Sequence, residues 1–114
     1  MKKVAIGLPV YNGEAYLTAA VESILAQTFT DFDLYISDNA STDRTEEICR
    51  QFAARDSRVV YVRQPRNIGA IPNFNAVAQM SRSPYFKWAA HDDTIAPAYL
   101  ERCVAVLDAD PSIV

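Results

Sequence analysis

Two adjacent acids, Asp92 and Asp93, directly follow a mostly apolar run over residues 85–90 that predicts a buried strand. Neighbouring carboxylates repel each other, and either a cation or exposure to water relieves that repulsion. Mg²⁺ and Mn²⁺ prefer oxygen ligands and usually keep waters or substrate phosphates in their coordination shell. The pair therefore suits an open divalent-metal site, and a solvated acidic start to the following helix is the alternative explanation. His91, the one histidine, lines or flanks this place, and we assign it no proton transfer.

Polar residues also follow the first predicted strand. Tyr11 offers a flat face on which a base can stack, and Asn12 offers both a donor and an acceptor. An ordinary strand-to-helix turn, bent by Pro9 and Gly13, accounts for the same residues.

The second predicted strand is followed by two acids with different explanations. Asp43 suits the N-cap of the next helix, and Glu46 three residues later completes a capping-box pattern. Asp38 lies five residues before that cap and can accept a hydrogen bond from a pyrimidine N3–H. A turn-forming role for Asp38 stays open.

The segment after the third predicted strand suits an anion. Asn67 and Gly69 fit a turn into a helix N-terminus, whose free N–H groups and positive dipole end attract phosphate. Arg66 can pair with a phosphate or be solvated. Asn73 and Asn75, on the first turns of that helix, can meet a ligand or cap the backbone.

The elements that must position these residues alternate along the chain. We expect strands at residues 4–8, 32–37, 59–63 and 85–90, and helices at residues 14–27, 43–55, 69–81 and 97–109. This alternation predicts a three-layer α/β/α sandwich, Rossmann-like, with a mainly parallel sheet and right-handed crossovers. Ligands of such sheets bind beyond the carboxyl ends of the strands, where the strand order switches.

Composition restricts the class of protein. With 114 residues, half of them hydrophobic, the chain suits one compact domain. A net charge of -3 argues against a nucleic-acid partner. No apolar run reaches the roughly 18 residues of a transmembrane helix, and the start lacks a signal-peptide core, so we expect a cytoplasmic protein, with the inner face of the membrane as the alternative location. Cys49 and Cys103 fit small core hydrophobes.

Several of these segments together resemble the N-terminal half of a family 2 glycosyltransferase of the GT-A fold. The matching segments cover almost the whole chain in the family's order: Leu8-Pro9-Val10-Tyr11-Asn12-Gly13-Glu14, Gln27-Thr28-Phe29-Thr30-Asp31-Phe32, Ser37-Asp38-Asn39-Ala40-Ser41-Thr42-Asp43, Arg66-Asn67-Ile68-Gly69 and His91-Asp92-Asp93.

The resemblance implies a nucleotide-diphosphate sugar donor, UDP- or dTDP-linked, with guanosine open, and a saccharide or lipid-linked acceptor. It implies that Pro9 and Tyr11 hold the base and that Asp38 reads the base edge. Asp92 and Asp93 then match the acidic motif for ribose and Mg²⁺ or Mn²⁺. The full set of nucleotide-sugar-binding residues that we expect is Pro9, Tyr11, Asn12, Glu14, Asp38, Arg66, Asn67, Gly69, Asn73 and Asp92.

Two departures from the family matter. Ala90 stands where many members have a further Asp, which leaves open which carboxylate dominates in metal binding. Family members also continue well beyond Val114, so the chain resembles a truncated domain. We expect the catalytic base beyond Val114, little or no transfer by this fragment alone, and possible self-association through an unpaired sheet edge. The alternative is a nucleotide-sugar-binding domain without activity.

Two other classes fit less well. A sugar-phosphate nucleotidyltransferase needs a glycine-rich, basic loop after its first strand, and residues 9–12 are neither. A receiver-type signalling domain groups its acid pair after the first strand, whereas here the pair follows the fourth.

Overall fold

The computed structural model describes residues 2–110 and 112, and its strands and helices alternate as expected. In chain order they are β1 (Val4–Val10), α1 (Leu17–Leu25), β2 (Phe32–Asp38), α2 (Thr45–Arg55), β3 (Val59–Arg63), α3 (Ala70–Ala78), β4 (Tyr85–Trp88) and α4 (Tyr99–Ala109). Each differs from its predicted range by at most three residues at either end, which is usual because element ends depend on local caps.

The four strands form one parallel sheet in the order β3-β2-β1-β4. The chain moves outward from β1 through β2 to β3 and then returns to the other side of β1 for β4. The strand order therefore switches between β1 and β4. Ligands of open α/β sheets bind beyond the carboxyl ends of the strands at such a point.

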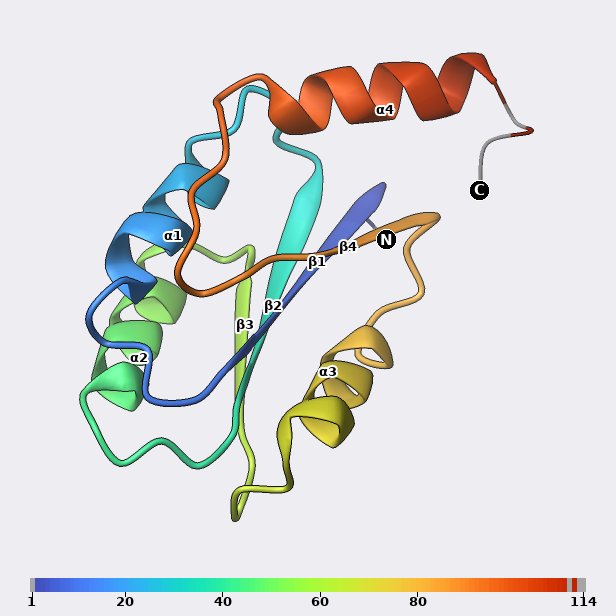
Figure 1. Ribbon diagram of the computed structural model, residues 1–114. Helices are drawn as coiled ribbons and strands as arrows, with labels where there is room; N and C mark the ends of the chain where they lie inside the picture. Colours follow the sequence, from blue (N-terminus) through green and yellow to red (C-terminus); the bar gives the residue numbers. More distant parts are fainter. Residues whose placement is uncertain (1, 111, 113–114) are drawn as a thin grey trace.

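Helices cover both faces of the sheet, so the predicted three-layer α/β/α sandwich is confirmed (Figure 1). Helices α1 and α2 lie together on one face, and α3 lies on the other, against β1 and β2. Helix α4 packs beside the amino ends of β1 and β4, where the Tyr85 hydroxyl donates to Asp108 at 2.6 Å.

The two faces of the sheet differ because successive side chains of β1 point to opposite faces. Its even-numbered residues are large and enter the main core beside α1, and β2 contributes in the same way. The odd-numbered residues are Ala5, Gly7 and Pro9, which leave room for α3. A Cβ at Gly7 would lie 2.7 Å from the Phe86 ring and 3.0 Å from a methyl group of Val77. The small residues thus allow α3 to approach β1 closely.

Strand β1 continues beyond the predicted stop at Leu8, through Pro9 to Val10. Proline removes a donor from a ladder and is tolerated where a strand has an open side. Pairing of β4 with β1 ends at Gly7 and Trp88, so Pro9 pairs across to Ser37 of β2 alone.

Helix α2 begins at Thr45 with Arg44 at the N-cap, so the prediction that Asp43 caps this helix is wrong. The Asp43 carboxylate instead accepts bonds from two N–H groups, Thr45 at 2.9 Å and Glu14 at 3.2 Å. Asp43 therefore joins two loops.

Cys49 is fully buried, as expected of a core residue, and burial raises the pKa of its thiol to about 12.

None of the helices in the described part of the chain combines the length and apolar composition needed to cross a bilayer.

Candidate functional site

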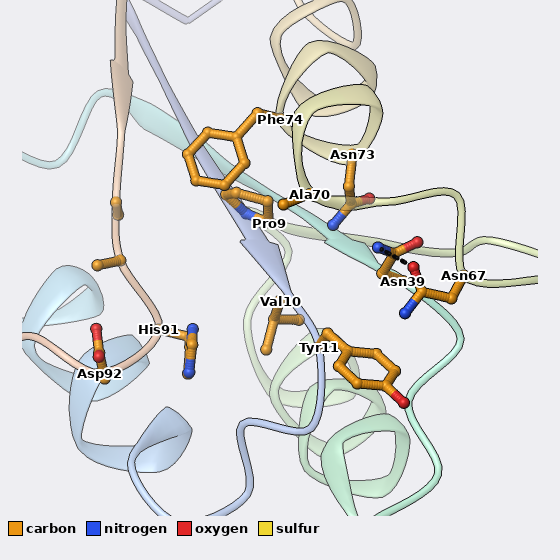
Figure 2. A pocket seen from close by; sticks show the side chains of 12 residues that line it. Pro9, Val10, Tyr11, Asn39, Asn67, Ala70, Asn73, Phe74, His91 and Asp92 are labelled. Carbon is orange, nitrogen blue, oxygen red and sulfur yellow. Dashed lines mark hydrogen bonds between the residues drawn. The ribbon is translucent and has the colours of Figure 1, made fainter.

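A cleft with a volume of about 400 Å³ lies at the carboxyl ends of β1, β2 and β4, against the start of α3 (Figure 2). This is the switch point of the strand order. Its lining residues come from four separate segments: Pro9, Val10, Tyr11, Asn39, Asn67, Ala70, Asn73, Phe74, Ala89, Ala90, His91 and Asp92.

Five of the eleven predicted site residues meet in this cleft. Those that line it are Pro9, Tyr11, Asn67, Asn73 and Asp92. Those that lie outside its lining are Asn12, Glu14, Asp38, Arg66, Gly69 and Asp93. The binding role of each of these residues stays a prediction.

Tyr11 lies at one end of the cleft with 45% of its surface exposed. An aromatic ring that is open on one face suits a base or another flat group. Tyr11 belongs to the loop after β1, and hydrogen bonds to the segment after β2 fix the position of that loop.

The loop after β1 is bonded to the loop after β2. The Asn12 N–H donates to Ser41 Oγ at 2.9 Å, and the Thr42 N–H donates to Asn12 Oδ1 at 2.8 Å. The Gly13 N–H donates to Thr45 Oγ1 at 2.9 Å. Asn12 adopts a positive φ of 50°, a conformation that asparagine tolerates better than most residues. The side chain of Asn12 thus serves loop geometry.

The backbone N–H of Glu14 takes part in the same connection through Asp43, while its own side chain is exposed. Partial burial by itself would raise the pKa of Asp43. Hydrogen bonds from Thr45 and from the Glu14 N–H outweigh that effect and hold the pKa of Asp43 below its ordinary value. The ionised carboxylate therefore stabilises the joined loops.

Asp38 has no exposed surface, and both of its oxygens accept hydrogen bonds inside the protein. Oδ1 accepts from the N–H and hydroxyl of Ser41, at 3.0 and 2.6 Å. Oδ2 accepts from the Tyr61 hydroxyl at 2.6 Å and from Arg63 at 3.4 Å. Burial and the Asp38 carboxylate raise the pKa of Tyr61, which stays a donor. The expectation that Asp38 faces a base is therefore corrected, because its side chain points to the α2 side of the sheet.

Asn39, the next residue, faces the cleft instead, and sequence reasoning did not select it. Residues 32, 34, 36 and 38 are buried on the side of α1 and α2, so residue 39 points to the other face. Period-two alternation carried through the end of β2 is the signal that identifies Asn39. Ala40 follows with a positive φ of 60°, which turns the chain sharply.

The Arg66–Gly69 loop contributes Asn67 to the cleft, while Arg66 is exposed outside it. Gly69 is the N-cap of α3 with a φ of 92°, a conformation that side chains rarely adopt. Asn73, one turn into α3, is almost completely buried. Its Oδ1 accepts from the Ser37 hydroxyl at 2.6 Å, and its Nδ2 donates to the Ser37 carbonyl at 3.0 Å. Asn73 thereby anchors α3 to β2.

His91 and Asp92 form the other end of the cleft (Figure 2). The His91 ring packs over Gly13, where a Cβ would lie 2.8 Å from the His91 Cδ2 atom and 2.7 Å from Val10 Cγ2. Asp93 is exposed beside Asp92, and its Oδ1 accepts from the N–H of Thr94 at 2.9 Å.

The oxygen ligands at the Asp92 end of the cleft suit a hard divalent cation. Asp92 and Asp93 supply carboxylate oxygens, which Mg²⁺ and Mn²⁺ favour, and both side chains are exposed. Within residues 2–110 and 112, no three His, Cys, Asp or Glu residues cluster as a complete metal site. A cation held here would therefore need further oxygen ligands from water or from a ligand's phosphates.

Comparison with known proteins agrees with this architecture. The model of the family described as "Glycosyl transferase family 2" matches residues 5–114. Glycosyltransferase GlyA of Streptococcus pneumoniae is 32% identical over 99 residues, which are 87% of this chain and 14% of that protein. Chondroitin synthase of Escherichia coli is 34% identical over 110 residues, which are 96% of this chain and 16% of that protein. The chain thus spans well under half of these relatives.

Two solved structures share the fold. S. aureus TarS 1-349 in complex with UDP has a TM-score of 0.87 at 24% identity, covering 94% of this chain and 32% of that one. The mannosyltransferase PcManGT from Pyrobaculum calidifontis, in complex with GDP-Man and Mn²⁺, has a TM-score of 0.80 at 21% identity, covering 96% and 33%. The fold is therefore that of GT-A enzymes, and because the family model matches nearly the whole chain, the chain belongs to glycosyl transferase family 2.

Proposed function

We propose that this chain binds the donor of a glycosyltransferase, a nucleotide-diphosphate sugar, and that the full-length enzyme transfers the sugar to an acceptor hydroxyl. One observation carries the proposal. The cleft places an open aromatic ring, Tyr11, at one end and a carboxylate, Asp92, at the other, with Asn39, Asn67 and Asn73 along its wall. A base, a ribose and a diphosphate present matching chemistry in the same order.

The base end of the proposed site is Tyr11 with Asn67. Stacking on an aromatic face contributes about 1–3 kcal/mol per base and tolerates any base. Amide groups then distinguish bases through their edges. UDP- and dTDP-linked donors fit, and the fold neighbours in complex with UDP and with GDP-Man support a nucleotide-linked donor.

The diphosphate end of the proposed site is Asp92 with Asp93, which would hold Mg²⁺ or Mn²⁺ together with phosphate oxygens. Such a cation, when bound, neutralises the charge of the nucleoside diphosphate leaving group as a Lewis acid. The Mn²⁺ in the PcManGT complex supports this choice of metal. Asp92 faces the cleft and Asp93 lies outside its lining, so Asp92 is nearer to the bound donor.

The remaining roles of the predicted residues are structural in this proposal. Asn12, Glu14 and Asp38 hold the loops after β1 and β2, and Gly69 turns the chain into α3. Arg66 is exposed near the Asn67 loop and can meet a phosphate when the donor is bound. The general base that deprotonates the acceptor belongs to the part of the enzyme beyond Val114.

Thermal stabilisation of the full-length protein tests the proposal. We expect UDP with Mn²⁺ to raise the melting temperature by more than UDP or Mn²⁺ alone, because the ion and the diphosphate complete one site. The shifts in melting temperature produced by GDP, dTDP and CDP with Mn²⁺ then show which base the protein prefers. If no nucleoside diphosphate shifts the melting temperature with or without the metal, the proposed function is wrong.

A further inference from the structure

Asn39 is a nearly buried amide at the back of the cleft, with 3% of its surface exposed. Its Nδ2 donates to Asn67 Oδ1 at 3.0 Å and to the Gly69 carbonyl at 3.2 Å. Its Oδ1 accepts from the Ile68 N–H at 2.8 Å. Three consecutive residues of the loop before α3 are thus bonded to one side chain from the end of β2.

These bonds determine how Asn67 is oriented. Its Oδ1 accepts from Asn39 Nδ2 and also from the Gly69 N–H at 2.8 Å, so both acceptor positions are used. An amide has its donor opposite its acceptor. The Nδ2 end of Asn67 therefore turns away from Asn39, and Figure 2 shows it on the side of Tyr11.

We infer that Asn39 is a positioning residue that sets the base preference of the cleft by holding the donor end of Asn67 toward it. A fixed N–H donor in the lining that also contains the Tyr11 ring favours a base edge that carries a keto oxygen, as in uracil. It disfavours the amino group that cytosine carries at the same position. The inference rests on the proposed function, because it requires a base stacked at Tyr11.

Asn39 acts through Asn67 because both of its own donor hydrogens are occupied. Both hydrogens of its Nδ2 and one acceptor position of its Oδ1 are used by the loop. Asn67 Nδ2, in contrast, makes no hydrogen bond to any residue within 2–110 and 112. Of the two side chains, the amide donor that is available to a ligand is therefore that of Asn67.

The test compares UDP and CDP affinities by calorimetry on the full-length protein, with Mn²⁺ present. Asn39→Asp keeps the size of the side chain and the acceptor for Ile68 but replaces the donating nitrogen by oxygen. Two acceptors would then face each other at the Asn67 contact, and rotation of the Asn67 amide relieves this while turning Oδ1 to the cleft. We expect the ratio of UDP to CDP affinity to fall by about tenfold, the change expected when one hydrogen bond to the base is exchanged for an unfavourable contact.

A matched control and a second pair of variants keep the test decisive. Gln51→Glu makes the same amide-to-carboxylate change on the exposed surface of α2 and should leave the ratio unchanged. If Asn39→Asp does not fold, Asn39→Ala and Asn67→Ala replace it. Each should lower the ratio, and the double variant should lower it no further than Asn67→Ala alone.

The outcomes separate this inference from the proposed function. Unaltered protein that binds no nucleoside diphosphate contradicts the proposed function. Unaltered protein that prefers UDP, while a folded Asn39→Asp variant keeps the same preference, overturns the role of Asn39. Fully additive effects of Asn39→Ala and Asn67→Ala on the ratio overturn it as well.

Discussion

The acid pair that follows β4 consists of two exposed carboxylates, of which Asp92 lines the end of the cleft proposed for the diphosphate and Asp93 lies outside the lining. Neither side chain forms an ion pair with another residue in the described part of the chain. Their charge is thus available to a cation, which in turn would bind phosphate oxygens. In the proposed site, the contribution of these two acids to donor binding would therefore depend on the metal.

Replacing either acid should remove the metal-dependent part of donor binding. We expect Asp92→Asn and Asp93→Asn to weaken UDP binding in Mn²⁺ by about 10- to 100-fold, the range for loss of a charged contact. UDP affinity in EDTA should hardly change. Glu22→Gln, which removes an exposed charge from α1, is the control. Unchanged affinity in Mn²⁺ for both variants would exclude this acid pair as the metal site.

Tyr11 provides a second test at the level of single residues. Tyr11→Phe keeps the ring and should bind UDP nearly as well as the unaltered protein. Tyr11→Ala removes the stacking face and should cost about 1–3 kcal/mol in binding free energy. Tyr16→Ala, at a tyrosine that is 63% exposed, should have no effect. Equal binding by the Phe and Ala variants of Tyr11 would show that the base lies elsewhere.

At the level of elements, the position of α3 depends on the bonds between Asn73 and Ser37. Both residues are buried, so removing the Asn73 amide leaves the Ser37 hydroxyl without its acceptor and the Ser37 carbonyl without the Asn73 donor, while Gln64 still donates to the hydroxyl. We expect Asn73→Ala to lower the free energy of unfolding by about 1–3 kcal/mol. Asn75→Ala, at an exposed position of the same helix, should change it little. Chemical denaturation measures both, and equal effects would contradict the anchoring role.

The connection between the loops after β1 and β2 should depend on pH through Asp43. Its pKa is lowered in the folded protein, so ionised Asp43 adds stability that is complete above the unfolded pKa of about 3.8. That stability is lost as the pH falls through the lower, folded pKa. We expect unaltered protein to be more stable than Asp43→Asn at pH 7, with the difference vanishing below the folded pKa. A difference that stays constant from pH 7 to pH 2 would contradict this.

For the molecule as a whole, the sheet ends at β4, which pairs with β1 on one side within the described residues. Phe86 and Trp88 of β4 are 36% and 47% exposed, and their rings contact each other edge to face at 5.1 Å between centroids. Exposed strand edges with apolar side chains favour association between chains. This surface therefore favours self-association.

The 114-residue chain prepared alone should self-associate as its concentration rises, and Trp88→Glu should weaken this by placing a charge at the β4 edge. Val106→Glu, which charges an exposed apolar position on α4, should leave association unchanged. Analytical ultracentrifugation over a range of concentrations measures it. A monomer at every concentration would contradict the prediction.

The sequence by itself determined the order and type of every element, because apolar residues recur with the period of a strand or a helix over each stretch. It also indicated that polar residues after the strands would meet, since parallel strands end at one edge of the sheet. Tyr11, Asn67 and Asp92, which lie far apart in the sequence, do line one cleft.

The tertiary structure alone decided which side chains face that cleft. A shift of one residue at a strand end moves a side chain to the opposite face, and this separates buried Asp38 from Asn39 at the cleft. Local composition treats these neighbours alike, because both are polar and suit a turn. Their roles differ because Ser41 and Tyr61 surround one, while the loop of Asn67 surrounds the other. Those partners are brought together only by the folded sheet.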